Sequence, residues 1–149
     1  MSEINPRYIH AIFCDDVRHE VGGKLSLMGI YQGSMNLTVQ TLPVVLPRIC
    51  AVITATTPIV EPFEKLEIKV LYGETVLSES VTPVEELSNT NMPPKSDLEK
   101  YNIHGTVFMM HPFVVERSDI LRVRAYTERG EVKVGGIQIN ITQVDQSPT

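Results

Sequence analysis

Tryptophan is absent from this 149-residue chain, cysteine occurs only twice, and aromatic residues make up 6% of the sequence. No apolar run approaches the roughly 20 residues that a membrane-spanning helix needs, so we expect no membrane contact. Residues 1–6 lack a basic stretch followed by a hydrophobic one, so we expect no secretory signal and a cytoplasmic location. The net charge of −5 disfavours general attraction to nucleic acid or to anionic membranes.

The two cysteines, Cys14 and Cys50, lie inside apolar, strand-like runs. Free cysteines are often buried in such runs, whereas disulfides are rare in a reducing cytoplasm. We therefore predict that both thiols are free and buried.

Motifs for catalysis are also missing. The sequence contains no Ser-His-Asp pattern, nucleophile elbow, phosphate-binding glycine loop or dinucleotide fingerprint. Successive residues of a strand point to opposite faces, so the neighbours Asp15 and Asp16 do not form a catalytic pair. His10, Cys14 and Asp16 could share a face, but no second cluster of ligands closes a zinc site around them. We predict no catalytic residues, no metal and no cofactor.

Short runs with period-2 alternation, separated by turn residues, predict a fold made almost entirely of strands. We expect one all-β domain over residues 1–149, an antiparallel β-sandwich of about eight strands, with a closed β-barrel as the alternative. Residues 82–102 are expected to form a long crossover loop with short helical turns, because Thr82 and Ser96 each begin a capping-box pattern. Residues 145–149 are expected to form a flexible polar tail.

The main expected strands cover residues 8–17, 25–31, 35–40, 49–56, 66–72, 75–81, 103–110, 120–127 and 132–144. The apolar segment Leu42–Pro47 carries a proline at each side. Proline cannot donate to a sheet ladder, so this segment is expected at an edge or a crossing.

The stretch Phe13–Tyr31 carries the clearest local signal, because two half-apolar strands flank the turn Val21-Gly22-Gly23. A three-residue connection brings opposite charges together and apolar residues together, which is what cross-strand pairing favours. The predicted pairs are Glu20 with Lys24, Val17 with Leu27, Asp15 with Gly29, and Phe13 with Tyr31.

In this register Asp15 shares a face with Phe13 and Val17. A buried carboxylate needs hydrogen bonds or a cation, so we predict a buried ion pair with Arg48 or Arg122 from another strand. The alternative is that Asp15 binds a ligand or a partner.

The last hairpin contains a change of parity. The valines of residues 132–134 occupy even positions, whereas the isoleucines of residues 137–141 occupy odd ones. Both sets can face the same core only if one extra residue is inserted between them. Gly135-Gly136 is the place where we predict this β-bulge.

Four side chains of the same hairpin could hold an anion. Arg122, Arg124 and Tyr126 share one face of the outgoing strand, and Lys133 is expected beside Tyr126 on the return strand. A cation over an exposed tyrosine ring contributes about 0.5–1 kcal/mol. The cluster predicts a site for a small anionic ligand or an acidic partner, with an ordinary solvated sheet face as the alternative.

The segment Phe13-Cys-Asp-Asp-Val-Arg18, followed by Glu20 and by Gly22-Gly-Lys-Leu-Ser-Leu-Met-Gly-Ile-Tyr31, resembles the opening of a family of small bacterial or prophage proteins of unknown function. The specific resemblance covers the first quarter of the chain. It implies a bacterial or prophage origin, and it implies no activity, cofactor or site residue.

The sequence leaves three function hypotheses open. The first is a non-enzymatic protein-binding or assembly module, which would bind a protein partner or a second copy through sheet edges or the long loop. The second is a binder of a small anionic ligand or nucleotide. The third is a metal-dependent hydrolase built on Asp15, Asp16 and the histidines. The missing catalytic motifs favour the first hypothesis.

Overall fold

The computed structural model describes residues 7–87 and 101–145, and over these residues the fold is all-β. The described part contains these elements: β1 (Tyr8–Glu20), β2 (Lys24–Ile30), β3 (Ser34–Val39), β4 (Val44–Leu46), β5 (Ile49–Pro58), β6 (Leu66–Tyr72), β7 (Thr75–Val81), α1 (Val84–Leu87), β8 (Tyr101–Met110), β9 (Phe113–Val115), β10 (Asp119–Thr127) and β11 (Gly130–Gln143). The described part thus has more strands than the eight or so expected, partly because the short β4 and β9 pair with each other.

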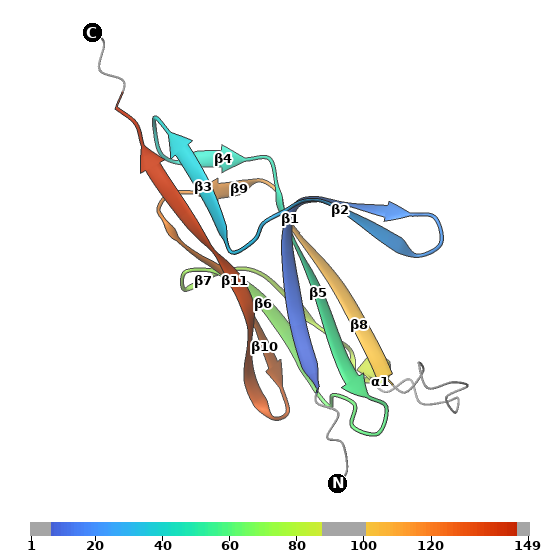
Figure 1. Cartoon of the computed structure of the whole chain (residues 1–149). Coiled ribbons are helices and arrows are strands. Elements are labelled where there is room, and N and C mark those ends of the chain that lie inside the picture. Colours follow the sequence, from blue (N-terminus) through green and yellow to red (C-terminus); the bar gives the residue numbers. More distant parts are fainter. Residues whose placement is uncertain (1–6, 88–100, 146–149) are drawn as a thin grey trace.

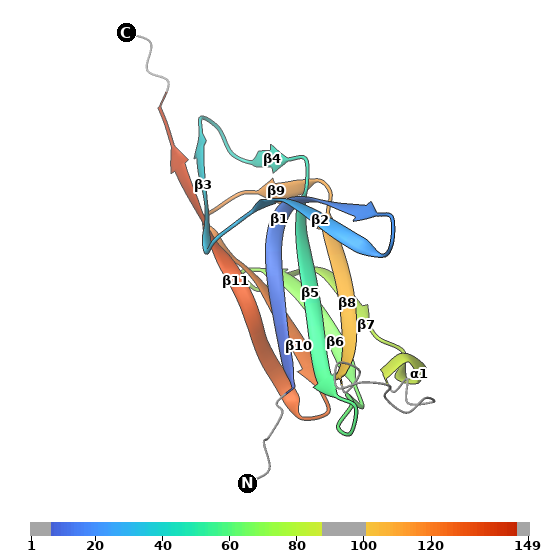
Figure 2. The same cartoon turned by 45° about the vertical axis from the view of Figure 1, so that its right-hand side comes forward.

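Two larger sheets form the body of the molecule (Figure 1, Figure 2). Sheet I has the strand order β2-β1-β5-β8, and sheet II has the order β3-β11-β10-β6-β7. Sheet I is antiparallel, but β3 pairs with β11 in parallel. The predicted all-β fold with antiparallel sheets is confirmed, and the β3–β11 pair adds one parallel pairing to it. Period-2 alternation reports which face a residue occupies and says nothing about strand direction, so this parallel pair could not be predicted.

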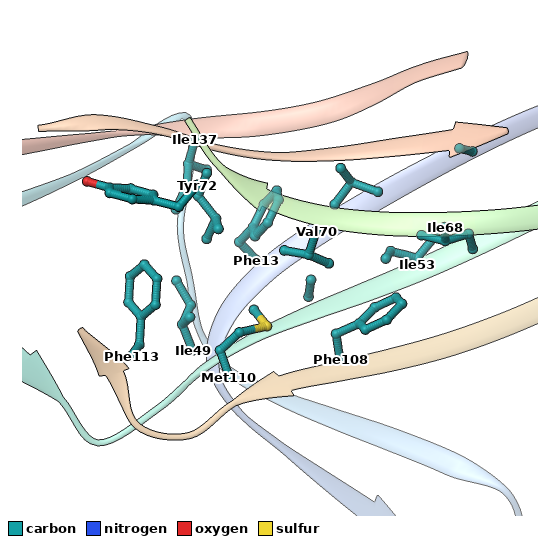
Figure 3. Close-up of a cluster of buried hydrophobic side chains, with 14 of the residues drawn as sticks. Phe13, Ile49, Ile53, Ile68, Val70, Tyr72, Phe108, Met110, Phe113 and Ile137 are labelled. Carbon is teal, nitrogen blue, oxygen red and sulfur yellow. The ribbon is translucent and has the colours of Figure 1, made fainter. Parts of the chain in front are cut away.

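The main hydrophobic core lies between the two sheets. In β6 every second residue is buried, from Leu66 to Tyr72, as its alternation predicts. Figure 3 labels ten core side chains, contributed by both sheets and by β9: Phe13, Ile49, Ile53, Ile68, Val70, Tyr72, Phe108, Met110, Phe113 and Ile137. Among the described residues the sheets share packed side chains and no strand, so the arrangement is a sandwich rather than a closed barrel.

The predicted crossover at residues 82–102 is described only in part. Helix α1 follows Pro83 directly, at the position of the first of the two predicted helical turns. The second turn, residues 88–100 of the loop, and residues 146–149 of the predicted flexible tail lie outside the described residues. Within the two described segments, no helix is both long and apolar enough to cross a membrane.

The last hairpin contains the predicted β-bulge. Val123 pairs with Gly135, but Arg124 pairs with Lys133, so Val134 is the extra residue. The shift in register lies directly beside Gly135-Gly136, and Ile137 after it is buried, as the change of parity predicts. The bulge therefore returns the second half of β11 to the core.

Candidate functional site

The β1–β2 hairpin has the predicted register, which includes the pairs Glu20 with Lys24 and Val17 with Leu27. Both glycines of the turn have positive φ values, 89° and 74°, which residues with a Cβ rarely adopt. Figures 1 and 2 show the hairpin leaving the line of β1 and projecting sideways past β5 and β8. The hairpin is thus an arm attached to sheet I.

Asp15 follows Cys14, the last residue of β1 that pairs with β5. Its carboxylate sits over Gly29, which has a φ of 69°, and it accepts a hydrogen bond from the Tyr31 hydroxyl. Burial, and then this hydrogen bond, raises the pKa of Tyr31 above its usual range, so the hydroxyl stays a donor. Asp15 itself is exposed, and the predicted buried ion pair with Arg48 or Arg122 is therefore wrong.

The error comes from a change of side-chain direction in β1. Phe13 packs in the main core, whereas Cys14 and Val17 both pack in a second, smaller cluster that includes Cys50 and Leu27. A regular strand would place Cys14 and Val17 on opposite faces.

Asp16, and not Asp15, forms an ion pair with Arg48. Arg48 Nη1 lies 3.2 Å from the Asp16 carboxylate, and the two side chains are 40% and 39% exposed. Exposed pairs of this kind contribute about 0–1 kcal/mol, so this contact is a minor support for the arm.

Cys14 and Cys50 face each other across β1 and β5. Both thiols are free and fully buried, which confirms the prediction. Burial, with a further contribution from the neighbouring thiol, raises the pKa of Cys14 from 9.0 to about 11. Because the thiolate is the reactive form, these cysteines are packing residues at neutral pH.

The bulge in β11 borders a surface hollow of about 300 Å³, which we call the arginine hollow. It is lined by Ile120, Arg122, Arg124, Gly135, Gly136, Ile137 and Gln138. Two of the four basic and aromatic residues predicted to form a site, Arg122 and Arg124, therefore meet here. The other two, Tyr126 and Lys133, do not line the hollow.

The ring of Tyr126 contacts a different cation from the one predicted. Lys69 Nζ lies 5.2 Å from the centre of the Tyr126 ring, in the place predicted for Lys133. The same ammonium lies 3.7 Å from Glu67 and 3.9 Å from Glu79. Lys69 belongs to β6, which pairs with β10. The alternation in the sequence shows on which face of β6 Lys69 lies, but it does not show that β10 is the neighbouring strand. Lys69 could therefore not be predicted as the partner of Tyr126.

A different candidate surface is the free edge of β8. This strand pairs with β5 through ten consecutive residue pairs without a shift in register, and no described strand lies on its other side. Its sequence, Tyr101 to Met110, contains no Lys, Arg, Asp, Glu or Pro. Three of its apolar side chains are exposed: Tyr101 by 37%, Ile103 by 68% and Met109 by 47%.

The other sheet edges carry features that discourage pairing. β2 begins with Lys24 and contains Gly29 in a left-handed conformation. β7 carries Glu79 and a shift in register against β6, and β3 has only six residues. Charges, bulges and short length are the usual protection of an edge strand. β8 has none of them, and no described strand lies on its free side.

Within residues 7–87 and 101–145, no group of three or more His, Cys, Asp or Glu side chains could hold a metal ion. His10 stacks on Tyr8, and His111 Nδ1 lies 2.8 Å from the Pro47 carbonyl. These histidines have structural neighbours, so the described residues give the hydrolase hypothesis no support.

A family model described as "Family of unknown function (DUF6941)" matches residues 9–113, well over half of the chain. The chain therefore belongs to this family, as the resemblance to a family of unknown function led us to expect. No curated protein matches the chain. The matched segment contains the arm and β8, whereas the arginine hollow on β10 and β11 lies beyond it.

Proposed function

We propose that the protein is a non-enzymatic assembly module, in which the edge of β8 pairs with β8 of a second copy. The observation that carries the proposal is the ten-residue, uncharged and unbroken edge of β8. A long, flat, apolar edge strand is a template for pairing with another chain. When a second strand is added to this edge, it forms hydrogen bonds with the main-chain N–H and C=O groups of β8 and also covers the exposed side chains.

The sequence of β8 is self-complementary in one antiparallel register. If Gly105 lies on the two-fold axis, apolar residues of the same face meet each other: Tyr101 with Met109, and Ile103 with the partly buried Val107. Such cross-strand pairs contribute about 0.2–1 kcal/mol each. The absence of any Lys, Arg, Asp or Glu means that no like charges meet across the axis. This symmetry favours a second copy over an unrelated partner.

The area involved is one strand wide, so we expect a dimer that forms and separates with concentration. Small interfaces of this kind are typical of transient complexes. The two free thiols favour a reducing compartment, so the proposal includes a cytoplasmic setting. The bacterial or prophage origin implied by residues 13–31 stays a prediction.

Sedimentation of the full chain over a wide concentration range tests the proposal. The wild-type chain should pass from monomer to dimer, and Ile103→Lys should remain a monomer because the ammonium would replace the apolar contact with Val107 of the other copy. Val81→Lys is the matched control, since Val81 is 66% exposed against 68% for Ile103 and lies on the edge strand of the other sheet. It should dimerise like the wild type.

Cross-linking tests the register. A Cβ at Gly105 would meet nothing within 4 Å, and its backbone conformation is open to other residues. Gly105→Cys should therefore fold and form a disulfide-linked dimer on mild oxidation, whereas Val81→Cys should not. A chain that sediments as a monomer at every concentration would refute the proposal. A dimer that survives Ile103→Lys would place the interface elsewhere.

A further inference from the structure

The arginine hollow is a space that the sequence of β11 creates. Gly136 pairs with Arg122 and Gly135 pairs with Val123, directly beside the bulge. A Cβ on Gly136 would lie 2.8 Å from the Leu121 carbonyl oxygen, so the close approach of the two strands requires glycine here. A Cβ on Gly135 would meet nothing within 4 Å. Two successive residues without side chains thus leave the guanidinium groups of β10 beside an open surface.

Arg122 makes no close ion pair with a described carboxylate, although its charge contributes to lowering the pKa of Asp119. No described carboxylate lies within 4 Å of it, whereas Lys69 of β6 and Arg124 of β10 each have one. The Nε atom of Arg122 is buried and has no hydrogen-bond partner among the described residues. A desolvated cation attracts an anion more strongly than a hydrated one, because the local dielectric is lower.

The rest of the rim is held in place. Arg124 Nε lies 3.5 Å from the Glu131 carboxylate, and its Nη1 donates to the Val123 carbonyl at 3.2 Å. The Gln138 amide donates to the carbonyls of Asp119 and Ile139, at 3.3 and 3.4 Å. These contacts fix the side chains on both sides of Arg122. Arg122 is therefore the group of the rim whose charge is available to a ligand.

We infer that the arginine hollow binds the oxyanion group of a small ligand, a carboxylate or a phosphate, with Arg122 as the main contact. A guanidinium presents its N–H groups in a planar fork that matches both anions. The volume of about 300 Å³ is at the lower end of ligand pockets, so the bound part is small. The chain as a whole has a net charge of −5, so general electrostatic attraction would not bring an anion here.

The test is a nuclear magnetic resonance titration of the full chain with two probes, inorganic phosphate and succinate. The buried Nε of Arg122 should give an observable Nε–Hε signal. Either probe should shift this signal and the backbone amides of Gly135 and Gly136 in a saturable way. The probe with the lower dissociation constant identifies the class of oxyanion.

Two variants should remove the effect without unfolding the chain. Arg122→Gln should weaken binding at least about tenfold, since it removes the charge-assisted hydrogen bonds. Gly135→Glu places a carboxylate beside the hollow, where the structure leaves open space, and should abolish binding. Arg129→Gln is the control: it makes the same charge change in the turn of the same hairpin, where Arg129 pairs with Glu61.

Three outcomes would overturn the inference. The first is that neither probe causes a saturable change in chemical shift. The second is that the probes change the chemical shifts of Arg129 and Arg122 equally. The third is that Arg122→Gln binds the probes as tightly as the wild type. The hollow is on sheet II and the pairing edge is on sheet I, so the monomeric variant Ile103→Lys should bind the probes like the wild type. Failure of the dimer and failure of the anion site can therefore be told apart.

Discussion

Replacing Gly29 with alanine should destabilise the protein more than any other single methyl group added to the arm. Gly29 lies in β2 with a φ of 69°, a left-handed conformation. A Cβ at this position would also lie 2.9 Å from Asp15 Cγ. The substitution therefore has two separate costs, one in the backbone and one in the side chain above it.

The two costs can be estimated independently. A residue with a Cβ in the left-handed region loses about 1–2 kcal/mol. The Asp15 side chain must also move aside, and it then loses the hydrogen bond from the Tyr31 hydroxyl, which has a net value of about 0.5–1.5 kcal/mol. The free energy of unfolding should fall by about 1.5–3.5 kcal/mol in total, measured by urea denaturation and linear extrapolation.

Two further variants separate the contributions. Gly23→Ala has a similar φ of 74° with nothing within 4 Å of the added Cβ, so it should lose only the backbone part. In an Asp15→Ala background, Gly29→Ala should likewise cost only about 1–2 kcal/mol, because the displaced carboxylate is gone. Equal destabilisation by Gly29→Ala and Gly23→Ala would refute this explanation. So would a loss of unfolding free energy on Gly29→Ala that is the same in the wild type and in the Asp15→Ala variant.

Two other predictions concern the buried thiols and the bulge. The free energy of unfolding should fall as the pH rises from about 9 to about 11, because the Cys14 thiol has a pKa of 9.0 when unfolded and about 11 when folded. Urea titrations at a series of fixed pH values measure this dependence, and Cys14→Ala should make it weaker. A pH dependence that is unchanged in Cys14→Ala would contradict the prediction. Gly136→Val should lower the free energy of unfolding by about 1–3 kcal/mol through its contact with the Leu121 carbonyl. Gly135→Val should be tolerated, and equal melting of the two valine variants would contradict the geometry.

Most strands could be predicted from the sequence because burial on one face forces a period of two. The bounds of β6 and β7 agree with the prediction to the residue, and the bounds of the other predicted strands differ by three residues at most. The register of the arm could also be predicted, because only one alignment joins Glu20 to Lys24 and Val17 to Leu27. Local patterns therefore determine both the strands and their nearest pairings.

Contacts between distant strands could not be predicted in the same way. Arg7, near one end of the chain, pairs with Glu128 and donates to the Glu61 carbonyl at 3.0 Å. Lys69 reaches Tyr126 only because β6 and β10 are neighbours in sheet II. No period or motif marks these partners, since each depends on which strands are adjacent after folding.

The two irregular places show when a break in alternation can be found from sequence. At Gly135-Gly136 several apolar residues of opposite parity stand on either side, so only an inserted residue can bury both sets. In β1 the only comparable signal is Cys14 against Val17, a single residue on each side, and the odd-numbered Phe13 and Val17 agree with a regular strand. The break was therefore missed and Asp15 was assigned to a buried face. One of these breaks lies where β1 passes from its pairing with β5 into the arm, and the other borders the arginine hollow. A parity conflict that involves even one small apolar residue, such as Cys14, next to a residue whose side chain lies over a glycine, such as Asp15 over Gly29, is thus the signal to search for when a binding surface is sought on an all-β chain.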